Sequence, residues 1–222
     1  FQGQSADLFE IGQLAVPAGS MLGIRGGSGS GKTTLLHCLA GIEPVRSGSV
    51  VWGSTDITQL SPSALTAWRL QNVGLVFQDF HLLEGLSAID NVLLPTSFTA
   101  WHASTALRTR AADLLKRAGI SDANRRTEVL SRGERQRVAV ARALLFAPPV
   151  VLFFFFFVLA DEPTASLDPE NRAIVAQLLC QMAQEHGATL IVVSHDAQLL
   201  EKMHQQMELR SGALHMLEES HV

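Results

Sequence analysis

A run rich in glycine constrains the fold of this chain more than any other feature. It reads Gly26-Gly27-Ser28-Gly29-Ser30-Gly31-Lys32-Thr33 and continues into Thr34, between an apolar segment expected to form a strand and one expected to form a helix. Glycines let backbone N–H groups converge on phosphate oxygens, and a helix N-terminus adds partial positive charge. Lys32 is expected to reach the β- and γ-phosphates of a nucleotide, and the Thr33 hydroxyl to hold Mg²⁺. A flexible glycine-serine turn is the alternative, but the flanking strand and helix favour nucleotide binding.

A pair of carboxylates is the second candidate part of the same site. Asp161-Glu162 follows apolar residues 158–160, so both side chains are expected at the C-terminal end of a buried strand, the edge where doubly wound sheets bind ligands. We expect Asp161 to hold Mg²⁺ through water and Glu162 to polarise the attacking water as a general base. An acidic pair that merely ends a strand is the alternative. His195, which also follows an apolar segment, is a candidate contact of the γ-phosphate or a structural histidine.

Strand and helix patterns alternate along the chain, which predicts an α/β fold with a mostly parallel sheet and helices on both faces. The expected strands cover residues 8–16, 21–24, 49–52, 73–77 and 189–193, with a hairpin over 208–217. The expected helices cover residues 32–40, 107–118 and 133–145, and others start at Ser61-Pro62, Asp168-Pro169 and Asp196.

Composition excludes several classes of protein. With 47% apolar and 17% charged residues, the 222-residue chain is expected to fold as a globule. Its net charge of −4 lacks the basic footprint of nucleic-acid binders, so no nucleic-acid partner is expected. Cys38 and Cys180 lie far apart in apolar helical patterns and are expected to be buried thiols. Residues 143–160 carry no charge, but Pro148-Pro149 interrupt them, so we do not expect this stretch to span a membrane.

The motifs together resemble the full motif set of ABC ATPases, in order and spacing, over nearly the whole chain. The set comprises Gly26–Thr33, Gln78, Leu130-Ser131-Arg132-Gly133-Glu134, Asp161-Glu162-Pro163-Thr164, Ser166-Leu167-Asp168 and His195. It is more specific than the glycine-rich loop alone, which also fits kinases and small GTPases. The resemblance implies one domain over residues 1–222: a core of the P-loop NTPase type, an N-terminal antiparallel β subdomain, and a helical subdomain inserted at about 79–145.

The resemblance also implies a role for each matching residue. Gln78 matches the Q-loop glutamine, which contacts Mg²⁺ and senses the transmembrane partner. Ser131 and Gly133 match the signature residues, which close on the γ-phosphate held by the other subunit. Asp168 matches the D-loop aspartate at the dimer interface, and His195 matches the switch histidine. Phe1 lies about where the family often stacks an aromatic ring on adenine, with a frayed terminus as the alternative.

The function implied by the resemblance is an ATP-binding and hydrolysing motor that uses Mg²⁺. It would dimerise, with a second copy or a homologous ATPase, around two ATP molecules and drive integral membrane permease subunits from the cytoplasmic face of the inner membrane. Residues 77–83 and 88–92 resemble the subgroup that includes lipoprotein-releasing and macrolide-efflux ATPases. A slow nucleotide-gated signalling subunit is an alternative. A non-transport ABC ATPase is another, which the lack of coiled-coil heptads, a second cassette and a basic stripe disfavours.

The signature departs from the family pattern Leu-Ser-Gly-Gly-Gln at two positions. Arg132 and Glu134 stand where the family has glycine and glutamine. Gly133 keeps close backbone approach possible, whereas Glu134 brings negative charge near a phosphate, which Arg132 is expected to offset. We therefore expect lower ATPase activity than in a variant carrying both Arg132→Gly and Glu134→Gln.

Five consecutive phenylalanines, Phe153 to Phe157, form the second departure. A strand over residues 150–160 would be about 36 Å long at ~3.3 Å per residue, far longer than usual, and a central strand cannot pack so many rings in one core. An irregularity of the recorded sequence, a bulged loop and an aggregation-prone surface are the explanations that we consider. A genuine insertion would put the placement of Asp161 and Glu162 in doubt.

Overall fold

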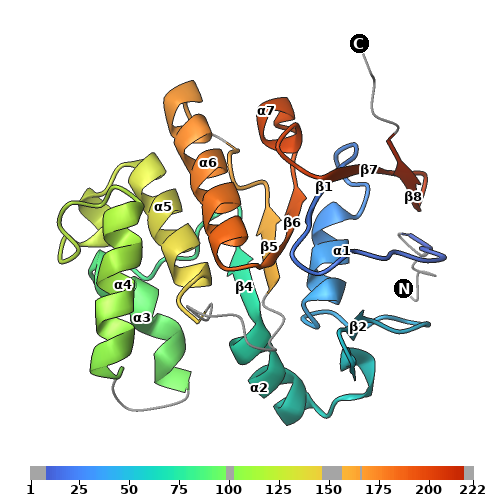
Figure 1. Cartoon of the computed structure of the whole chain (residues 1–222), viewed down its shortest axis with the longest axis horizontal. Helices are drawn as coiled ribbons and strands as arrows, with labels where there is room; N and C mark the ends of the chain where they lie inside the picture. The colour runs from blue at the N-terminus through green and yellow to red at the C-terminus, as the bar shows by residue number, and fades with distance from the viewer. Residues whose placement is uncertain (1–8, 99–102, 147–156, 166, 218–222) are drawn as a thin grey trace, which may run out of the picture.

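The computed structural model describes residues 9–98, 103–146, 157–165 and 167–217. Its centre is a six-stranded sheet in the order β4-β5-β6-β1-β7-β8, visible in Figure 1. Every neighbouring pair runs parallel except β7 and β8, so the prediction of a mostly parallel sheet is confirmed. The strands are β1 (Met21–Arg25), β4 (Val73–Val76), β5 (Phe157–Asp161), β6 (Thr189–Val193), β7 (Gln205–Arg210) and β8 (Ala213–Met216).

A separate antiparallel pair, β2 (Val51–Trp52) and β3 (Thr55–Asp56), follows the first helix. The helices are α1 (Lys32–Leu39), α2 (Pro62–Asn72), α3 (Ala88–Leu93), α4 (Thr105–Arg117), α5 (Arg132–Ala143), α6 (Pro169–Glu185) and α7 (Ala197–Leu200). Short 3₁₀ helices cover Ile57–Gln59, Leu94–Phe98 and Thr127–Val129. Among the described residues, no helix combines the length and the apolar character needed to cross a membrane.

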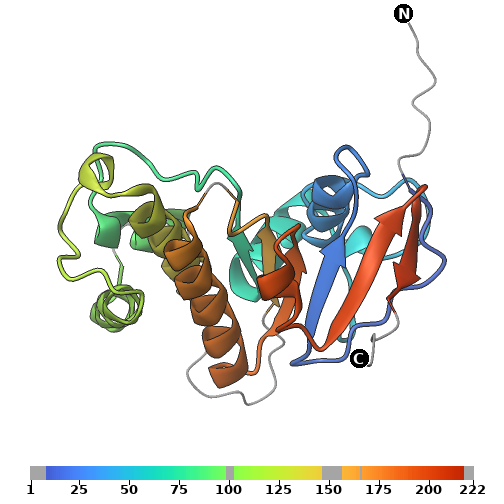
Figure 2. The ribbon, with the colours of Figure 1, turned by 90° about the horizontal axis from the view of Figure 1, so that it is seen from above.

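Alternating side chains of the buried strands divide the core between the two faces of the sheet. On β5, Leu159 packs into the cluster that contains Leu35 and Leu36 of α1. Val158 and Ala160 instead join the larger cluster built from α3 to α6. Figure 2 shows the same arrangement from above, with α1 on one side of the sheet and α5 and α6 on the other. Helices therefore cover both faces, as the α/β pattern predicts.

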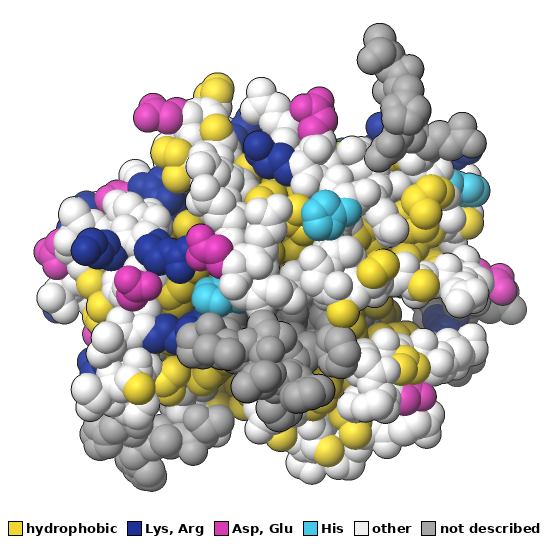
Figure 3. Space-filling view, viewed as in Figure 1, with side chains coloured by type: hydrophobic (Ala, Val, Ile, Leu, Met, Phe, Trp, Pro, Cys, Tyr) yellow, Lys and Arg dark blue, Asp and Glu magenta, His cyan; other side chains and the backbone are white. Residues whose placement is uncertain are grey.

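Helix α4 shows why the middle of the chain forms an outer layer. Its buried residues Ala111, Leu114 and Leu115 recur on one face, while charged residues occupy the other. In the space-filling view, Lys and Arg side chains gather on the left side of the molecule, with Asp and Glu side chains among them (Figure 3). An ion pair between Arg117 and Glu185 joins α4 to the end of α6.

Most helices begin where the sequence predicts, because serine or aspartate side chains cap them. Ser61 accepts from the N–H of Ala64 at the start of α2, and Asp168 accepts from that of Asn171 at the start of α6. A proline follows each of these caps, as expected for the first helical position.

The strand predicted over residues 8–16 is wrong for the part that the structure describes, since residues 9–16 form no strand. Phe9, Ile11 and Leu14 pack partly buried against the α1 side of the core, so the alternation of apolar residues is satisfied by packing. Glu10 N–H donates to the Gly212 carbonyl oxygen, one contact rather than a ladder. The predicted strand over 49–52 is shorter in the structure, where β2 starts at Val51.

Candidate functional site

The glycine-rich loop joins the end of β1 to the start of α1, as its motif requires. Gly29 and Gly31 have φ angles of 74° and 94°, in the left-handed region that favours glycine. A Cβ on Gly26 would lie 2.5 Å from the Leu209 carbonyl oxygen, so only glycine fits beside β7. Lys32 is 8% exposed, and its Nζ donates to the carbonyl oxygens of Gly26 at 2.8 Å and Gly27 at 3.0 Å. The loop thus folds around the ammonium group of its own lysine.

The N-terminus of α1 has no side-chain cap. Gly31 occupies the cap position, and the N–H groups of the next residues, Lys32, Thr33 and Thr34, have no acceptor within the helix. Helices α2 to α7 all have a serine or aspartate that accepts from a first-turn N–H. Free donors, partial positive charge and a lysine therefore converge at this one helix start, which suits a phosphate group.

The two halves of the predicted site meet at the carboxyl edge of the sheet. Thr33 Oγ1, on the first turn of α1, donates to Asp161 Oδ2, at the end of β5, over 2.8 Å. Both oxygens are hard ligands of the kind that Mg²⁺ prefers. In the described ranges, no group of three or more His, Cys, Asp or Glu residues is placed so that it could hold a metal ion.

Glu162 and His195 come together beside this pair. The Glu162 backbone has a φ of 43°, unusual for a residue with a side chain, and its N–H continues the ladder by donating to the Val193 carbonyl oxygen at 2.8 Å. Glu162 Oε2 accepts from the His195 N–H at 3.2 Å and from Ser194 Oγ at 3.3 Å. His195 Nε2 lies 3.4 Å from Glu162 Oε1, and 57% of the His195 side chain is exposed against 16% of that of Glu162. The carboxylate is therefore fixed by the turn after β6. Sequence reasoning missed Ser194 as part of this arrangement.

Gln78 lies just after β4, the strand next to β5, and so at the same edge of the sheet as Asp161. The following residues Phe80 and His81 have φ angles of 62° and 45°. Arg142 of α5 donates to both of their carbonyl oxygens, at 2.5 and 2.6 Å, and burial lowers the pKa of Arg142 to about 10. The guanidinium of Arg132, at the other end of α5, lies 5.3 Å from the centroid of the Phe80 ring. Helix α5 thus holds the segment that follows Gln78.

The residues predicted to form the signature, Ser131 to Gly133, lie at the start of α5. Ser131 Oγ accepts from the Glu134 N–H at 3.2 Å, and Glu134 Oε2 accepts from the Ser131 N–H at 2.8 Å, which makes a capping box. Arg125 Nη1 lies 2.9 Å from Glu134 Oε1. The Ser131 N–H and, less strongly, Arg125 lower the pKa of Glu134.

The expectation that Arg132 offsets the charge of Glu134 is therefore wrong. Arg125 makes the ion pair with Glu134, while Arg132 lies over Phe80. The physical reason is the capping box, which turns the Glu134 carboxylate back toward the preceding loop that carries Arg125.

The remaining predicted residues lie partly outside the described ranges. Asp168 caps α6, and its pKa is lowered chiefly by the hydrogen bond from the Asn171 N–H. Phe1, Ser166 and residues 153–156 of the phenylalanine run lie outside the described residues. Phe157, the last of the run, begins β5, a strand of five residues that places Asp161 at its end.

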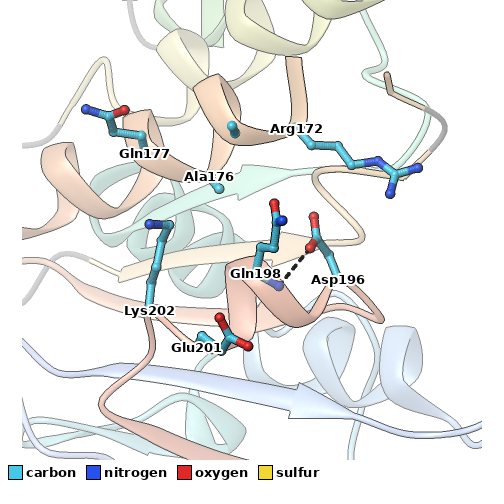
Figure 4. Close-up of a pocket in the computed structure, with 8 residues that line it drawn as sticks. Arg172, Ala176, Gln177, Asp196, Gln198, Glu201 and Lys202 are labelled. Atoms are coloured by element: carbon cyan, nitrogen blue, oxygen red, sulfur yellow. Dashed lines mark hydrogen bonds between the residues drawn. The ribbon is translucent and has the colours of Figure 1, made fainter. Parts of the chain in front are cut away.

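A cavity of about 340 Å³ lies between α6 and α7, close to but apart from this site (Figure 4). Among the residues that line it are Arg172, Asp196, Glu201 and Lys202, charges of both signs. Asp196 Oδ1 accepts from the Gln198 N–H at 3.0 Å, the contact drawn in the figure. None of the predicted site residues lines this cavity.

Comparison with known proteins shows to which family this chain belongs. The family described as ABC transporter matches residues 10–165, more than half of the chain. The chain belongs to the ABC transporter family. Over 203 residues it is 42% identical to the lipoprotein-releasing system ATP-binding protein LolD of Idiomarina loihiensis, an alignment that covers 91% of this chain and 86% of LolD.

Solved structures of the ABC transporter family agree with the assignment. The dimeric ATP-binding cassette MJ0796, in a post-hydrolysis state bound to ADP and Pi, superposes with a TM-score of 0.79 at 34% identity, covering 92% of this chain and 88% of that one. The structure of cbiO1 from Clostridium perfringens, part of the ABC transporter complex cbiONQ, gives 0.77 at 29% identity, covering 91% and 78%. The chain is thus an ATP-binding cassette that hydrolyses ATP, the ATPase unit of an ABC transporter.

Proposed function

We propose that two copies of this cassette close around two ATP molecules and drive a membrane permease of the lipoprotein-releasing type. In this arrangement each ATP lies between the glycine-rich loop of one copy and the Ser131–Gly133 corner of its mate. The identity with LolD supports the type of permease, and the dimeric relative supports the pairing. The chain would act at the cytoplasmic face of the inner membrane, as one domain over residues 1–222 with its helical subdomain at about 79–145.

The observation that carries the proposal is the meeting of Thr33 with Asp161 beside the Glu162–His195 pair. We assign the nucleotide phosphates to residues 26–34 and the attacking water to Glu162, which acts as general base. His195 contacts the γ-phosphate. Ser131 and Gly133 approach the partner's nucleotide, with Asp168 beside them at the interface. Phe1 is the proposed adenine contact.

Mg²⁺ fits the oxygen donors present at the edge of the sheet. Thr33, Asp161 through water, and Gln78 would hold the ion, which supplies charge neutralisation to the phosphates when it is bound. The chain's own residues then have separate tasks: Lys32 and the α1 N–H groups bind the phosphates, and Ser194 and His195 orient the Glu162 carboxylate.

The variant Glu162→Gln tests the proposal, because it keeps the shape of the side chain and removes the base. With ATP and Mg²⁺, we expect this variant to form a stable dimer in size-exclusion chromatography with light scattering, and its kcat to fall by about 10²- to 10⁴-fold. The same variant carrying Lys32→Ala should stay monomeric. A Glu162→Gln chain that remains monomeric at saturating ATP, in the presence of its permease, would refute the sandwich.

A further inference from the structure

The starts of α5 and α6 meet at Gly133, where the side chain of Asn171 occupies the space beside the glycine. A Cβ built on Gly133 would lie 2.2 Å from Asn171 Oδ1 and 2.4 Å from Asn171 Cγ. Non-bonded carbon atoms pack at about 3.5–4.0 Å, so no side chain fits there while Asn171 stays in place. Helices α5 and α6 lie side by side in Figures 1 and 2, with these starts at neighbouring ends.

The amide of Asn171 is not free to turn away, because hydrogen bonds hold both of its ends. Its Oδ1 accepts from Arg137 Nη1 of α5 at 2.6 Å, and its Nδ2 donates to Asp168 Oδ2 at 2.7 Å. The Asn171 backbone N–H donates to the other oxygen, Asp168 Oδ1, at 3.0 Å. Moving the amide would therefore leave a charged guanidinium and a carboxylate without these partners.

These contacts connect two places that the sequence treats as separate motifs. The Ser131–Gly133 corner and Asp168 lie far apart in the sequence, and no local pattern relates them. The side chain of Asn171 nevertheless contacts both. We propose that Asn171 is a positioning residue that fixes the Ser131–Gly133 corner relative to the Asp168 turn, so that both face the second copy together. This inference rests on the proposed function, because only a dimer closed around ATP brings both against a partner.

The inference also explains why position 133 is glycine in this chain. If the amide of Asn171 fills the space, then Gly133→Ala must displace that amide and break its bonds to Asp168 and Arg137. In the stability of the nucleotide-free chain, Gly133→Ala and Asn171→Ala would then remove the same connection, and the second change would add little to the first. If close approach of nucleotide alone required the glycine, the two changes would act independently.

Thermal unfolding of the single and double variants tests the packing without any nucleotide. Alanine is a better helix former than glycine, so Gly133→Ala should not lower the melting temperature once Asn171→Ala has emptied the space. In the chain that keeps Asn171, we expect Gly133→Ala to lower it. An equal fall in both backgrounds would overturn the packing inference.

ATP-dependent dimerisation tests the positioning role. In the Glu162→Gln background, we expect Asn171→Ala to raise the ATP concentration for half-maximal dimer by about three- to tenfold, the range for one or two lost hydrogen bonds. Gln177→Ala removes an exposed amide from the same helix and should leave it unchanged, while Leu178→Ala, a buried change on α6, controls for lost stability alone.

The two possible failures can be told apart. If Glu162→Gln dimerises with ATP and Asn171→Ala matches the Gln177→Ala control, Asn171 does not position the corner, and the proposed function stands. If Asn171→Ala merely follows Leu178→Ala at equal loss of melting temperature, its role is structural and the inference is wrong. If Glu162→Gln never dimerises, the proposed function fails, and the positioning role fails with it.

Discussion

Thr33 Oγ1 donates a hydrogen bond to Asp161 Oδ2 over 2.8 Å, although the two residues lie 128 positions apart in the chain. The bond joins the first turn of α1 to the end of β5, two elements that meet because β1 and β5 both flank β6 in the parallel sheet. A hydroxyl and a carboxylate held this closely form one side of an oxygen-rich site. In the proposed function, this site holds Mg²⁺.

Replacing the Asp161 carboxylate should chiefly change the Mg²⁺ dependence of the ATPase activity. We expect Asp161→Asn to raise the Mg²⁺ concentration for half-maximal ATPase activity by about 10- to 100-fold, because the amide keeps the contact with Thr33 but loses the charge. ATPase assays over a Mg²⁺ titration measure this effect. Asp113→Asn, an exposed change on α4, is the control. An unaltered Mg²⁺ titration in Asp161→Asn would contradict the assignment.

Ser194 belongs to none of the sequence motifs, but it should affect catalysis through Glu162. Ser194 is fully buried, donates to Glu162 Oε2 and accepts from the Asp196 N–H at 3.0 Å. We expect Ser194→Ala to lower kcat by about three- to tenfold with little change in KM, because a carboxylate that loses one hydrogen bond is held less firmly. Steady-state kinetics separate the two constants. A rise in KM at constant kcat would show that Ser194 serves binding rather than the orientation of Glu162.

The sequence predicted the elements at the carboxyl edge of the sheet well, because its motifs are local and the rule that places such motifs at the carboxyl ends of parallel strands is general. The strand–loop–helix around Gly31 and the strand that ends at Asp161 follow directly from that rule. The sequence did not predict the contact between Glu162 and His195. No local signal indicates that β5 and β6 lie next to each other.

Contacts of long side chains could not be predicted, because they depend on how helices pack. Arg125, Arg137 and Arg142 look alike in sequence, yet they hold Glu134, Asn171 and the carbonyl oxygens of 80 and 81 respectively. The strand expected over 8–16 failed for a related reason: an alternating pattern reports which residues pack inward, but not whether the backbone finds a partner strand.

The altered signature should make the cassette slower than it could be. We expect the variant carrying Arg132→Gly and Glu134→Gln to hydrolyse ATP about two- to fivefold faster. Most of the gain should come from Arg132→Gly, because Arg132 puts a large side chain where the family has glycine, whereas Glu134 is already paired with Arg125. Loss of the contact with the Phe80 ring should slightly lower the melting temperature of the same variant. ATPase assays and thermal unfolding of the double variant and both single variants check these opposite directions. Equal or lower ATPase activity in the double variant would refute the prediction.

Glu134 should also make the free energy of unfolding depend on pH. Its folded-state pKa is lowered, first by the hydrogen bond from the Ser131 N–H, below the ordinary glutamate value of about 4.3. A lowered folded pKa means that the unfolded chain binds more protons, so the stabilisation by Glu134 is present above about pH 5 and is lost as the pH falls through the folded pKa.

The comparison of the native chain with Glu134→Gln isolates this contribution. Glutamine keeps an oxygen for the Ser131 N–H but cannot carry charge, so the native chain should be more stable at pH 7 by about 0.5–1 kcal/mol, the range for a partly exposed ion pair. The difference should shrink as the pH falls below about 4.3 and should vanish once the carboxylate is protonated. Urea unfolding of both chains between pH 7 and pH 3.5 measures it. A difference that stays constant over this range would show that the ionised Glu134 carboxylate does not stabilise the fold.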